Sequence, residues 1–261
     1  MGRLGDVRSL VREYGPTLDD VLRRRDEAER ALAAVSGDTH ELEHAEAAAE
    51  RARTALIAAG EALNTARAAA APDFCALLHT EASALAMSGA DSEVSFEELP
   101  FENWGESGPC RAEFLYRSAP GQPARPLARI ASGGEISRVM LALKGVLGSA
   151  DEASVLVFDE VDAGIGGATA GAVGERLAAL ARTHQVIVVT HLAQVAAFAD
   201  MQLVVRKAVE DDGAFTTVVP VEGDDRVGEI ARMLSGNDTE ASRSHARELL
   251  EASVSARRAS G

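Results

Sequence analysis

The chain has 261 residues, 46% of them hydrophobic, which fits one sizeable globular domain or two small ones. Its formal net charge of −15 excludes a surface that attracts nucleic acid everywhere, because non-specific DNA affinity comes from basic side chains that neutralise phosphates, so any DNA contact is expected to be local or made elsewhere in an assembly. No run approaches the roughly 20 apolar residues that span a bilayer, so we expect no membrane association and a cytoplasmic, nucleoid-associated protein.

The first long segment, residues 17–70, is rich in alanine, glutamate and arginine, a composition typical of exposed helices. Apolar side chains recur there every three or four residues, as along the seam of a coiled coil. Residues 36–39 interrupt this pattern with a glycine, an aspartate and a threonine, which are residue types that end one helix and cap the next. The pattern therefore predicts an antiparallel coiled-coil hairpin.

Pro72 is expected to interrupt the second helix of this hairpin, because proline lacks an N–H group and disfavours a helical residue before it. A further helical segment is expected at residues 73–87. Beyond it, residues 93–99 and 111–118 have the β-branched and aromatic content of strands and flank a turn-rich segment. They predict a small antiparallel pair of strands.

The rest of the chain alternates between helical and strand patterns, which is typical of an α/β domain with a buried parallel sheet. Short helices are expected after His191 and at the C-terminal end. The other expected elements are helices at residues 134–147 and 169–182 and strands at residues 154–158, 185–190, 201–206 and 215–221.

A glycine-rich motif stands directly before the first of these helices: Ser132, Gly133, Gly134 and Glu135. Free N–H groups, the positive end of the helix dipole and a hydroxyl converge at such a helix start, and glycine lets a phosphate approach the backbone. The motif therefore indicates an anion-binding site. A structural helix cap uses the same residue types, and this alternative stays open.

Two adjacent carboxylates, Asp159 and Glu160, follow an apolar strand at its C-terminal end, where ligands bind in open α/β sheets. This is a Walker B pattern. Asp159 is the candidate ligand for Mg²⁺, and Glu160 is the candidate base that deprotonates the water attacking a γ-phosphate. The alternative is a polar strand end that simply faces solvent.

Asp162 continues from this strand, and His191 ends the next buried strand, which places both at the same sheet edge. A histidine in this position can donate a hydrogen bond to a γ-phosphate and so distinguish ATP from ADP. The order and spacing of the whole set are more specific than any member of it.

In this order the motifs resemble the signature, Walker B strand, D-loop and switch histidine of the ABC-type ATPases. The amino-acid sequences of residues 131–138, 158–167 and 183–196 resemble those of the RecN family in particular. The likeness implies an α/β fold: residues 88–261 would be the C-terminal lobe of an ATPase head with a parallel sheet. Residues 1–87 would be a segment of its coiled-coil arm.

The resemblance also implies a composite ATP site between two heads. Ser132, Gly133, Gly134 and Glu135 would contact the γ-phosphate held by a partner, and Asp162 would lie along the dimer interface. Asp159 would serve Mg²⁺, Glu160 would be the catalytic base and His191 the switch. ATP would close the heads, and the arm would transmit this closure to DNA during double-strand-break repair and recombination.

The phosphate-binding motif G-x-x-x-x-G-K-[ST] is missing from the sequence. We therefore expect the chain to hydrolyse ATP only when an N-terminal half of the same family, or a second head, supplies this loop. The chain would be either a fragment or a separate subunit. A non-hydrolytic scaffold and another ABC-type ATPase subunit are the alternatives.

One further motif, His40-Glu41-Leu42-Glu43-His44, fits the H-E-x-x-H pattern of zinc sites. It lies on the expected coiled coil without a third ligand or a pocket, so a solvated helix face explains it better.

Overall fold

The computed structural model describes residues 3–130, 132–148, 153–210 and 213–259, and Ala131 of the glycine-rich segment lies outside them. The chain divides into two compact units, Met1–Thr65 and Ala66–Gly261. The division falls inside one long helix, and the arm boundary at residue 87 stays a prediction. In chain order the elements are α1 (Arg3–Tyr14), α2 (Leu18–Ala84), β1 (Asp91–Glu98), η1 (Phe101–Asn103), β2 (Cys110–Arg117), β3 (Arg125–Pro126), η2 (Leu127–Arg129), α3 (Gly133–Leu147), β4 (Val155–Phe158), α4 (Gly167–Leu180), β5 (Gln185–Val188), α5 (Ala193–Ala196), β6 (Gln202–Glu210), β7 (Gly213–Val221), α6 (Gly223–Ser235) and α7 (Glu240–Ala259).

Helix α2 begins with a reciprocal cap. The backbone N–H of Thr17 donates to Asp20 Oδ2 (3.1 Å), and the backbone N–H of Asp20 donates to Thr17 Oγ1 (3.2 Å). This arrangement satisfies N–H groups that have no partner within the helix.

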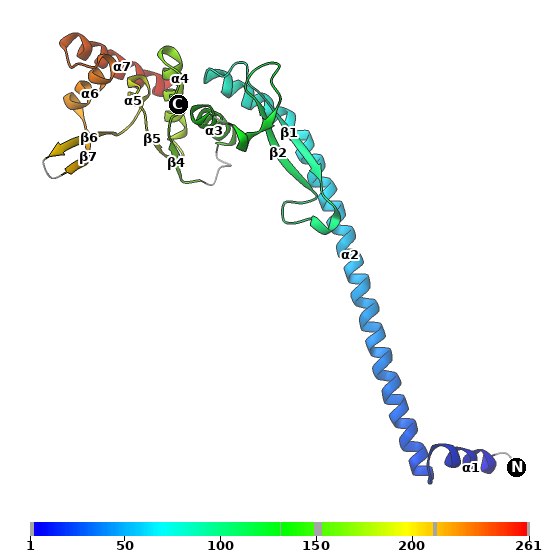
Figure 1. The fold of residues 1–261 in the computed structure, drawn as a ribbon. Coiled ribbons are helices and arrows are strands. Elements are labelled where there is room, and N and C mark those ends of the chain that lie inside the picture. The colour runs from blue at the N-terminus through cyan, green and yellow to red at the C-terminus, as the bar shows by residue number, and fades with distance from the viewer. Residues whose placement is uncertain (1–2, 131, 149–152, 211–212, 260–261) are drawn as a thin grey trace. The chain divides into compact units, whose positions relative to one another are not determined.

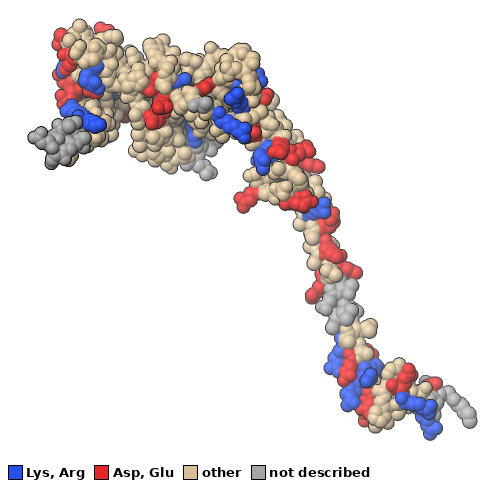
Figure 2. All heavy atoms as spheres, viewed as in Figure 1, with Lys and Arg blue, Asp and Glu red and all other residues tan. Residues whose placement is uncertain are grey.

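The predicted hairpin turn at residues 36–39 is wrong, because α2 runs through this segment without a break. A glycine inside a helix costs about 1 kcal/mol relative to alanine, which good helix formers on both sides offset. The apolar seam expected from the sequence is present but uncovered: Leu32, Leu42 and Leu56 are 71%, 59% and 50% exposed. Figure 2 shows acidic and basic side chains interspersed along α2.

Pro72 lies inside α2, so the predicted interruption of the helix is also wrong. Proline in a helix interior costs about 3 kcal/mol. The turns that follow bury Leu78, Ala82 and Leu85, and each buried leucine contributes about 1.5–3 kcal/mol. This burial outweighs the lost hydrogen bond, and residues 73–84 continue the helix.

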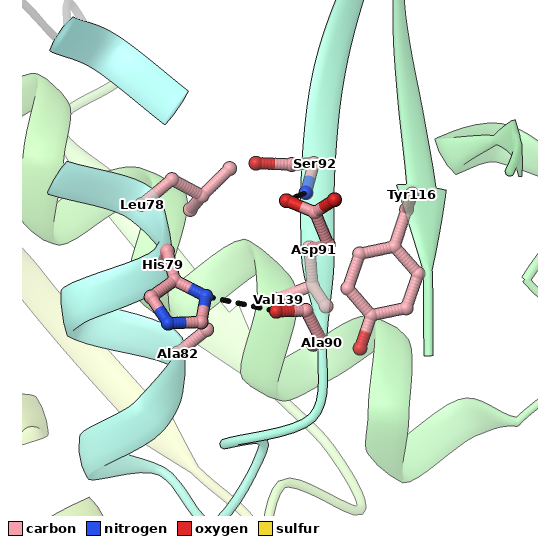
Figure 3. A pocket seen from close by; sticks show the side chains of 8 residues that line it. All are labelled: Leu78, His79, Ala82, Ala90, Asp91, Ser92, Tyr116 and Val139. Atoms are coloured by element: carbon pink, nitrogen blue, oxygen red, sulfur yellow. Dashed lines mark hydrogen bonds between the residues drawn. The ribbon is translucent and has the colours of Figure 1, made fainter. Parts of the chain in front are cut away.

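The predicted antiparallel pair is confirmed by β1 and β2, which pair from Asp91↔Arg117 to Glu98↔Cys110. The short strand β3 joins β2 and completes a three-stranded sheet. His79 Nδ1 of α2 lies 2.9 Å from the carbonyl oxygen of Ala90, just before β1 (Figure 3). The cavity beside this contact has a volume of only about 10 Å³, which is too small for a ligand.

The predicted parallel sheet is confirmed by β4 and β5, which lie side by side in Figure 1 and pair from Val155↔Gln185 to Phe158↔Val188. Side chains of α2, α3 and α4 pack on one face of this pair. The core cluster includes Leu85, Val139, Leu141, Leu156, Phe158 and Val173.

The opposite face of the parallel pair is exposed, so among the described residues the sheet that the sequence predicts to be buried is covered on one face only. Residues alternate between the two faces of a strand, and apart from Gln185 the outward-facing residues are apolar. Val155, Val157, Ile187 and Val189 are 50%, 66%, 47% and 59% exposed. We call these four residues the outer sheet face.

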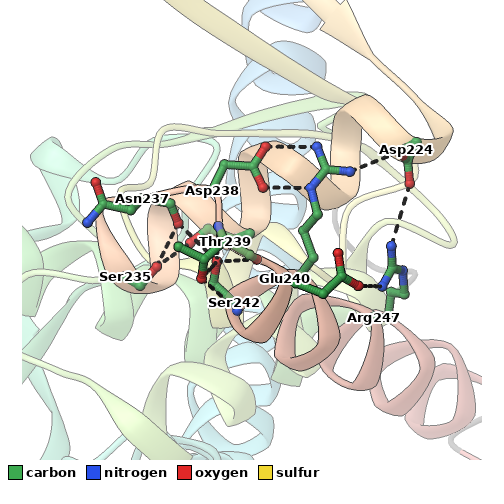
Figure 4. Close-up of polar contacts among 10 residues, drawn as sticks. Asp224, Ser235, Asn237, Asp238, Thr239, Glu240, Ser242 and Arg247 are labelled. Atoms are coloured by element: carbon green, nitrogen blue, oxygen red, sulfur yellow. Dashed lines mark hydrogen bonds and ion pairs between the residues drawn. The ribbon is translucent and has the colours of Figure 1, made fainter.

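The expected final strands are β6 and β7, which form an antiparallel hairpin, and two helices follow it. Arg243 of α7 ties the helices together by donating to Asp238 Oδ1 (2.6 Å), Asp238 Oδ2 (2.8 Å) and Asp224 Oδ2 (2.8 Å). Ser242 and Thr239 cap the start of α7 reciprocally (Figure 4). The C-terminal helices therefore form a polar-clamped pair around Ile230, Ala231 and Ala246.

Candidate functional site

The glycine-rich motif forms the start of α3. Ser132 is the N-cap, and its hydroxyl accepts a hydrogen bond from the backbone N–H of Glu135 at 3.4 Å. Ser132 and Gly133 are exposed, whereas Gly134 is buried. The side chain of Ser132 therefore caps the helix, and the start of α3 is exposed to solvent, where an anion could reach it.

Both glycines allow α3 to approach the loop that follows β4. A Cβ on Gly134 would lie 2.7 Å from Ala163 Cβ and 2.9 Å from the carbonyl oxygen of Glu160. A Cβ on Gly133 would meet the carboxylate of Glu160. The close approach of helix and loop therefore requires a glycine at Gly134, whereas at Gly133 an added Cβ would displace only the flexible end of Glu160.

The two predicted carboxylates lie exposed at the end of β4. Asp159 Oδ1 accepts the backbone N–H of Glu160 at 2.9 Å, and Ser137 of α3 donates to the carbonyl oxygen of Asp159 at 2.7 Å. Glu160 has a left-handed backbone (φ +55°), which is rare for residues other than glycine and is often found at functional sites.

A metal at this site would find one carboxylate ligand in Asp159, because no cluster of three ligating side chains exists among the described residues. A single hard oxygen ligand fits Mg²⁺, which commonly binds one or two carboxylates and takes its remaining ligands from water and phosphate. His40 and His44, whose ring centroids lie 4.5 Å apart, have no third metal-ligating side chain beside them in the described part of the chain.

Asp162 joins the β4 loop to the end of β5. Its side chain is only 3% exposed, and Oδ2 accepts hydrogen bonds from Thr190 Oγ1 (2.5 Å) and from the backbone N–H of His191 (3.0 Å). His191 Nδ1 lies 3.2 Å from the same oxygen, while the ring itself is 74% exposed. Asp162 therefore contacts the candidate switch histidine within its own chain.

Two contacts near the motif residues are not predicted by the sequence. Arg138 of α3 donates from Nη1 to the carbonyl oxygens of Val161 (3.3 Å) and Ala163 (2.8 Å), so it holds the loop from the helix side. Tyr116 of β2 donates to Glu135 Oε1 at 3.1 Å, and burial together with the Glu135 carboxylate raises the pKa of the Tyr116 phenol. These contacts join positions that are far apart in the sequence, so no local sequence pattern predicts them.

Glu135 therefore differs from its three neighbours in the motif. Its carboxylate is engaged by Tyr116, whereas Ser132 and Gly133 are exposed at the helix start. A carboxylate close to a phosphate would also be repelled by it. The structure thus gives Glu135 a contact that joins α3 to β2.

A surface groove with a volume of about 430 Å³ lies between α4 and α7 and includes none of the motif residues. The motif residues lie instead at an open edge of the parallel sheet.

No described helix is both long enough and apolar enough to cross a membrane.

A long helix that leads into a mixed α/β unit, with a helix start, two carboxylates and a histidine at one edge of a parallel pair, resembles the heads of SMC-like, ABC-type ATPases. Within that class the chain belongs to the RecN family. It is 41% identical to the DNA repair protein RecN of Treponema pallidum over 98% of this chain, and 44% identical to that of Deinococcus radiodurans over 95%. The RecN of Streptomyces coelicolor is 47% identical over 76% of the chain.

These matches cover 46%, 43% and 37% of the respective relatives, so the chain spans less than half the length of the curated relatives it matches. No family model matches the sequence. Among solved structures, the Smc head domain of Pyrococcus yayanosii with a coiled coil and joint is 20% identical, with a TM-score of 0.48, over 83% of this chain and 38% of that chain.

Proposed function

We propose that the chain supplies one side of a composite ATP site in a RecN-type DNA repair ATPase, and that a partner polypeptide supplies the phosphate-binding loop. The partner is an N-terminal half of the same family or a second head. ATP then drives engagement of the heads during repair of DNA double-strand breaks. DNA is contacted through the complete assembly, because this chain carries a net charge of −15.

The observation that carries this proposal is the joining of α3 to the loop after β4. Gly133 packs against Glu160, and Ser137 and Arg138 bind the loop backbone at Asp159, Val161 and Ala163. The exposed helix start and the exposed carboxylates are therefore held as one unit. Such a unit can bind the terminal phosphoryl group of a nucleotide that is held by the partner polypeptide.

The exposure of the outer sheet face supports the proposal that a partner polypeptide completes the head. Parallel sheets are found almost only with both faces covered, and this face exposes four apolar side chains. The β6–β7 hairpin has a similar face, on which Leu203 and Val205 are 54% and 68% exposed. Among the described strands, β4 and β5 pair only with each other. A polypeptide that adds strands and helices here would bury both surfaces.

Each residue has a chemical role in this proposal. Ser132, Gly133 and Gly134 offer a hydroxyl and helix N–H groups to the terminal phosphate. Glu160 orients and deprotonates the attacking water, and His191 donates to the γ-phosphate. Mg²⁺ neutralises charge on the phosphate oxygens when it is bound, and Asp159 holds it.

The test is to mix the chain with a polypeptide carrying the phosphate-binding half of a RecN protein. ATP turnover and association are then measured with and without DNA. We expect no turnover by the chain alone, turnover in the mixture, and a loss of about 10²-fold or more in kcat for Glu160→Gln. Unchanged turnover by the variant would show that Glu160 is not the base.

The signature motif is tested by Ser132→Arg, which places a bulky cation where the terminal phosphate is expected. The variant should abolish ATP-dependent association, while Ser255→Arg on the exposed face of α7 serves as the matched control and should leave it unchanged. An isolated variant with an unaltered thermal melt shows that folding is intact. Association without any turnover in the wild-type mixture would favour the scaffold function instead.

A further inference from the structure

The contact between Asp162 and His191 carries a specific chemical consequence. Asp162 is almost fully buried, and the polar groups that reach its Oδ2 belong to Thr190 and His191. The hydroxyl of Thr190 and the backbone N–H of His191 both donate. The third group is His191 Nδ1, which lies 3.2 Å from the same oxygen. An oxygen of an ionised carboxylate can only accept hydrogen bonds, so a bond between the two atoms requires a proton on Nδ1.

We infer that Asp162 is a positioning residue that keeps a proton on Nδ1 of His191 and directs Nε2 outward. The protonated nitrogen of a histidine is set by the partner of the other nitrogen, and the partner here is buried and fixed by two further bonds. The exposed ring, at 74%, leaves Nε2 on the accessible side. The other acids of the loop are engaged elsewhere, because Asp159 accepts from Glu160 and the Glu160 carboxylate lies against Gly133.

This assignment constrains how His191 contacts a phosphate, a step that rests on the proposed function. A phosphate oxygen accepts hydrogen bonds, whereas Nε2 of a neutral ring protonated on Nδ1 is itself an acceptor. His191 must therefore take up a proton from solvent at Nε2 when it engages the terminal phosphate. Asp162 offsets the resulting positive charge, because a carboxylate in contact with an imidazolium favours its charged form.

The first experiment uses the 261-residue chain alone and requires no nucleotide. Two-bond ¹H–¹⁵N correlation spectra of the ¹⁵N-histidine-labelled chain report which ring nitrogen is protonated, and His191→Gln identifies the signal among the six histidines. We expect the neutral ring of His191 to be protonated predominantly on Nδ1. A ring protonated predominantly on Nε2 would overturn the inference.

Variants separate positioning from general effects of charge. Asp162→Asn keeps the shape of the buried side chain and removes its charge, and Asp162→Ala removes the acceptor. Both should lose the predominance of the Nδ1-protonated form. Glu160→Gln, a matched charge removal in the same loop without a bond to His191, should keep it. Equal spectra for wild type and Asp162→Asn would contradict the role of Asp162; the wild-type spectrum decides the tautomer even if a variant fails to fold.

The second experiment uses the mixture with the phosphate-binding half. Calorimetry of ATP binding at pH 8 in two buffers of different ionisation heat counts protons, and we expect uptake of about one proton that is lost in Asp162→Asn. Binding without proton uptake would overturn the imidazolium step. Failure of the mixture to bind ATP at all would refute the proposed function, while the spectra of the isolated chain would still decide the role of Asp162.

Discussion

Gly133 and Gly134 are adjacent in sequence but meet different atoms of the loop after β4, so we expect different effects of adding a methyl group. At Gly134 the added Cβ meets Ala163 Cβ at 2.7 Å and a backbone oxygen at 2.9 Å, and neither atom can rotate away. Gly134→Ala should destabilise the chain by about 1–3 kcal/mol, which is typical of overpacking. Urea unfolding of the isolated chain measures this loss.

Gly133→Ala is the matched control, because its Cβ meets only the flexible end of Glu160. The isolated chain should unfold within about 0.5 kcal/mol of wild type, as is usual for changes without a core mechanism. Turnover in the reconstituted mixture should nevertheless fall, because the Glu160 carboxylate is displaced. Equal destabilisation by both variants would contradict the contact that the structure shows.

At this scale the sequence predicts which residues gather at the sheet edge, but not what each one touches. Asp159 and Glu160 follow a strand, and Ser132 precedes a helix, so local pattern places them. The bonds of Asp162 to Thr190 and of Tyr116 to Glu135 depend on the packing of segments 28 and 19 residues apart. Periodicity carries no information on such pairs, and the roles of the site residues remain proposals.

At the scale of elements, α2 and the predicted hairpin make opposite predictions for Gly37. A continuous helix gains about 1 kcal/mol when an interior glycine becomes alanine, whereas a turn that uses a left-handed glycine loses stability. We therefore expect Gly37→Ala to raise the thermal stability of the helix and slow amide hydrogen exchange around residue 37. Faster exchange and a lower melting temperature would instead support the predicted hairpin turn.

The clamp between α6 and α7 predicts a pH dependence. The guanidinium of Arg243 lowers the pKa of Asp238 below its ordinary value of 3.8. A carboxyl whose pKa is depressed on folding contributes stability that is fully present above the ordinary value and is lost as the pH falls through the folded value. Arg243→Ala should therefore be less stable than wild type at pH 7, and the difference should shrink below pH 3.8.

Urea unfolding of both proteins at pH 7, 4 and 3 tests this expectation, with Arg247→Ala as a control. Arg247 lies on the same helix and makes longer ion pairs with Asp224 and Glu240, at 3.9 Å and 3.3 Å. It should show a smaller change with pH. A difference between Arg243→Ala and wild type that stays constant down to pH 3 would exclude the clamp as its cause.

Elements with a strong local pattern of residue types were predicted well, whereas the hairpin turn in the long helix was not. The strands β4 and β5 follow from runs rich in β-branched residues, and β1 and β2 from aromatic side chains on either side of a turn-rich segment. The turn predicted at residues 36–39 was wrong, because alanine, glutamate and arginine favour the helix on both sides of this segment. A single glycine is too weak to stop it.

At the scale of the whole molecule, the parallel pair is covered on one face only. The chain spans 46% of the RecN of Treponema pallidum, and a sheet of two parallel strands is smaller than the usual four to six. Apart from Gln185, the residues of these two strands are apolar, as expected for strands buried on both faces. The exposed outer sheet face is therefore better explained by a neighbouring polypeptide than by adaptation to solvent.

Val157→Asp tests this explanation, because Val157 lies on the outer sheet face and is 66% exposed. In the isolated chain the aspartate meets water, so the thermal melt should change little. In the assembly it would be buried without a partner, which costs several kcal/mol. We expect affinity for the phosphate-binding half to fall by about 100-fold or more, since each tenfold corresponds to about 1.4 kcal/mol. Val254→Asp, at a 39% exposed valine on α7, is the matched control and should bind normally. Titration calorimetry separates these outcomes, and equal affinity of the two variants would place the partner on another surface.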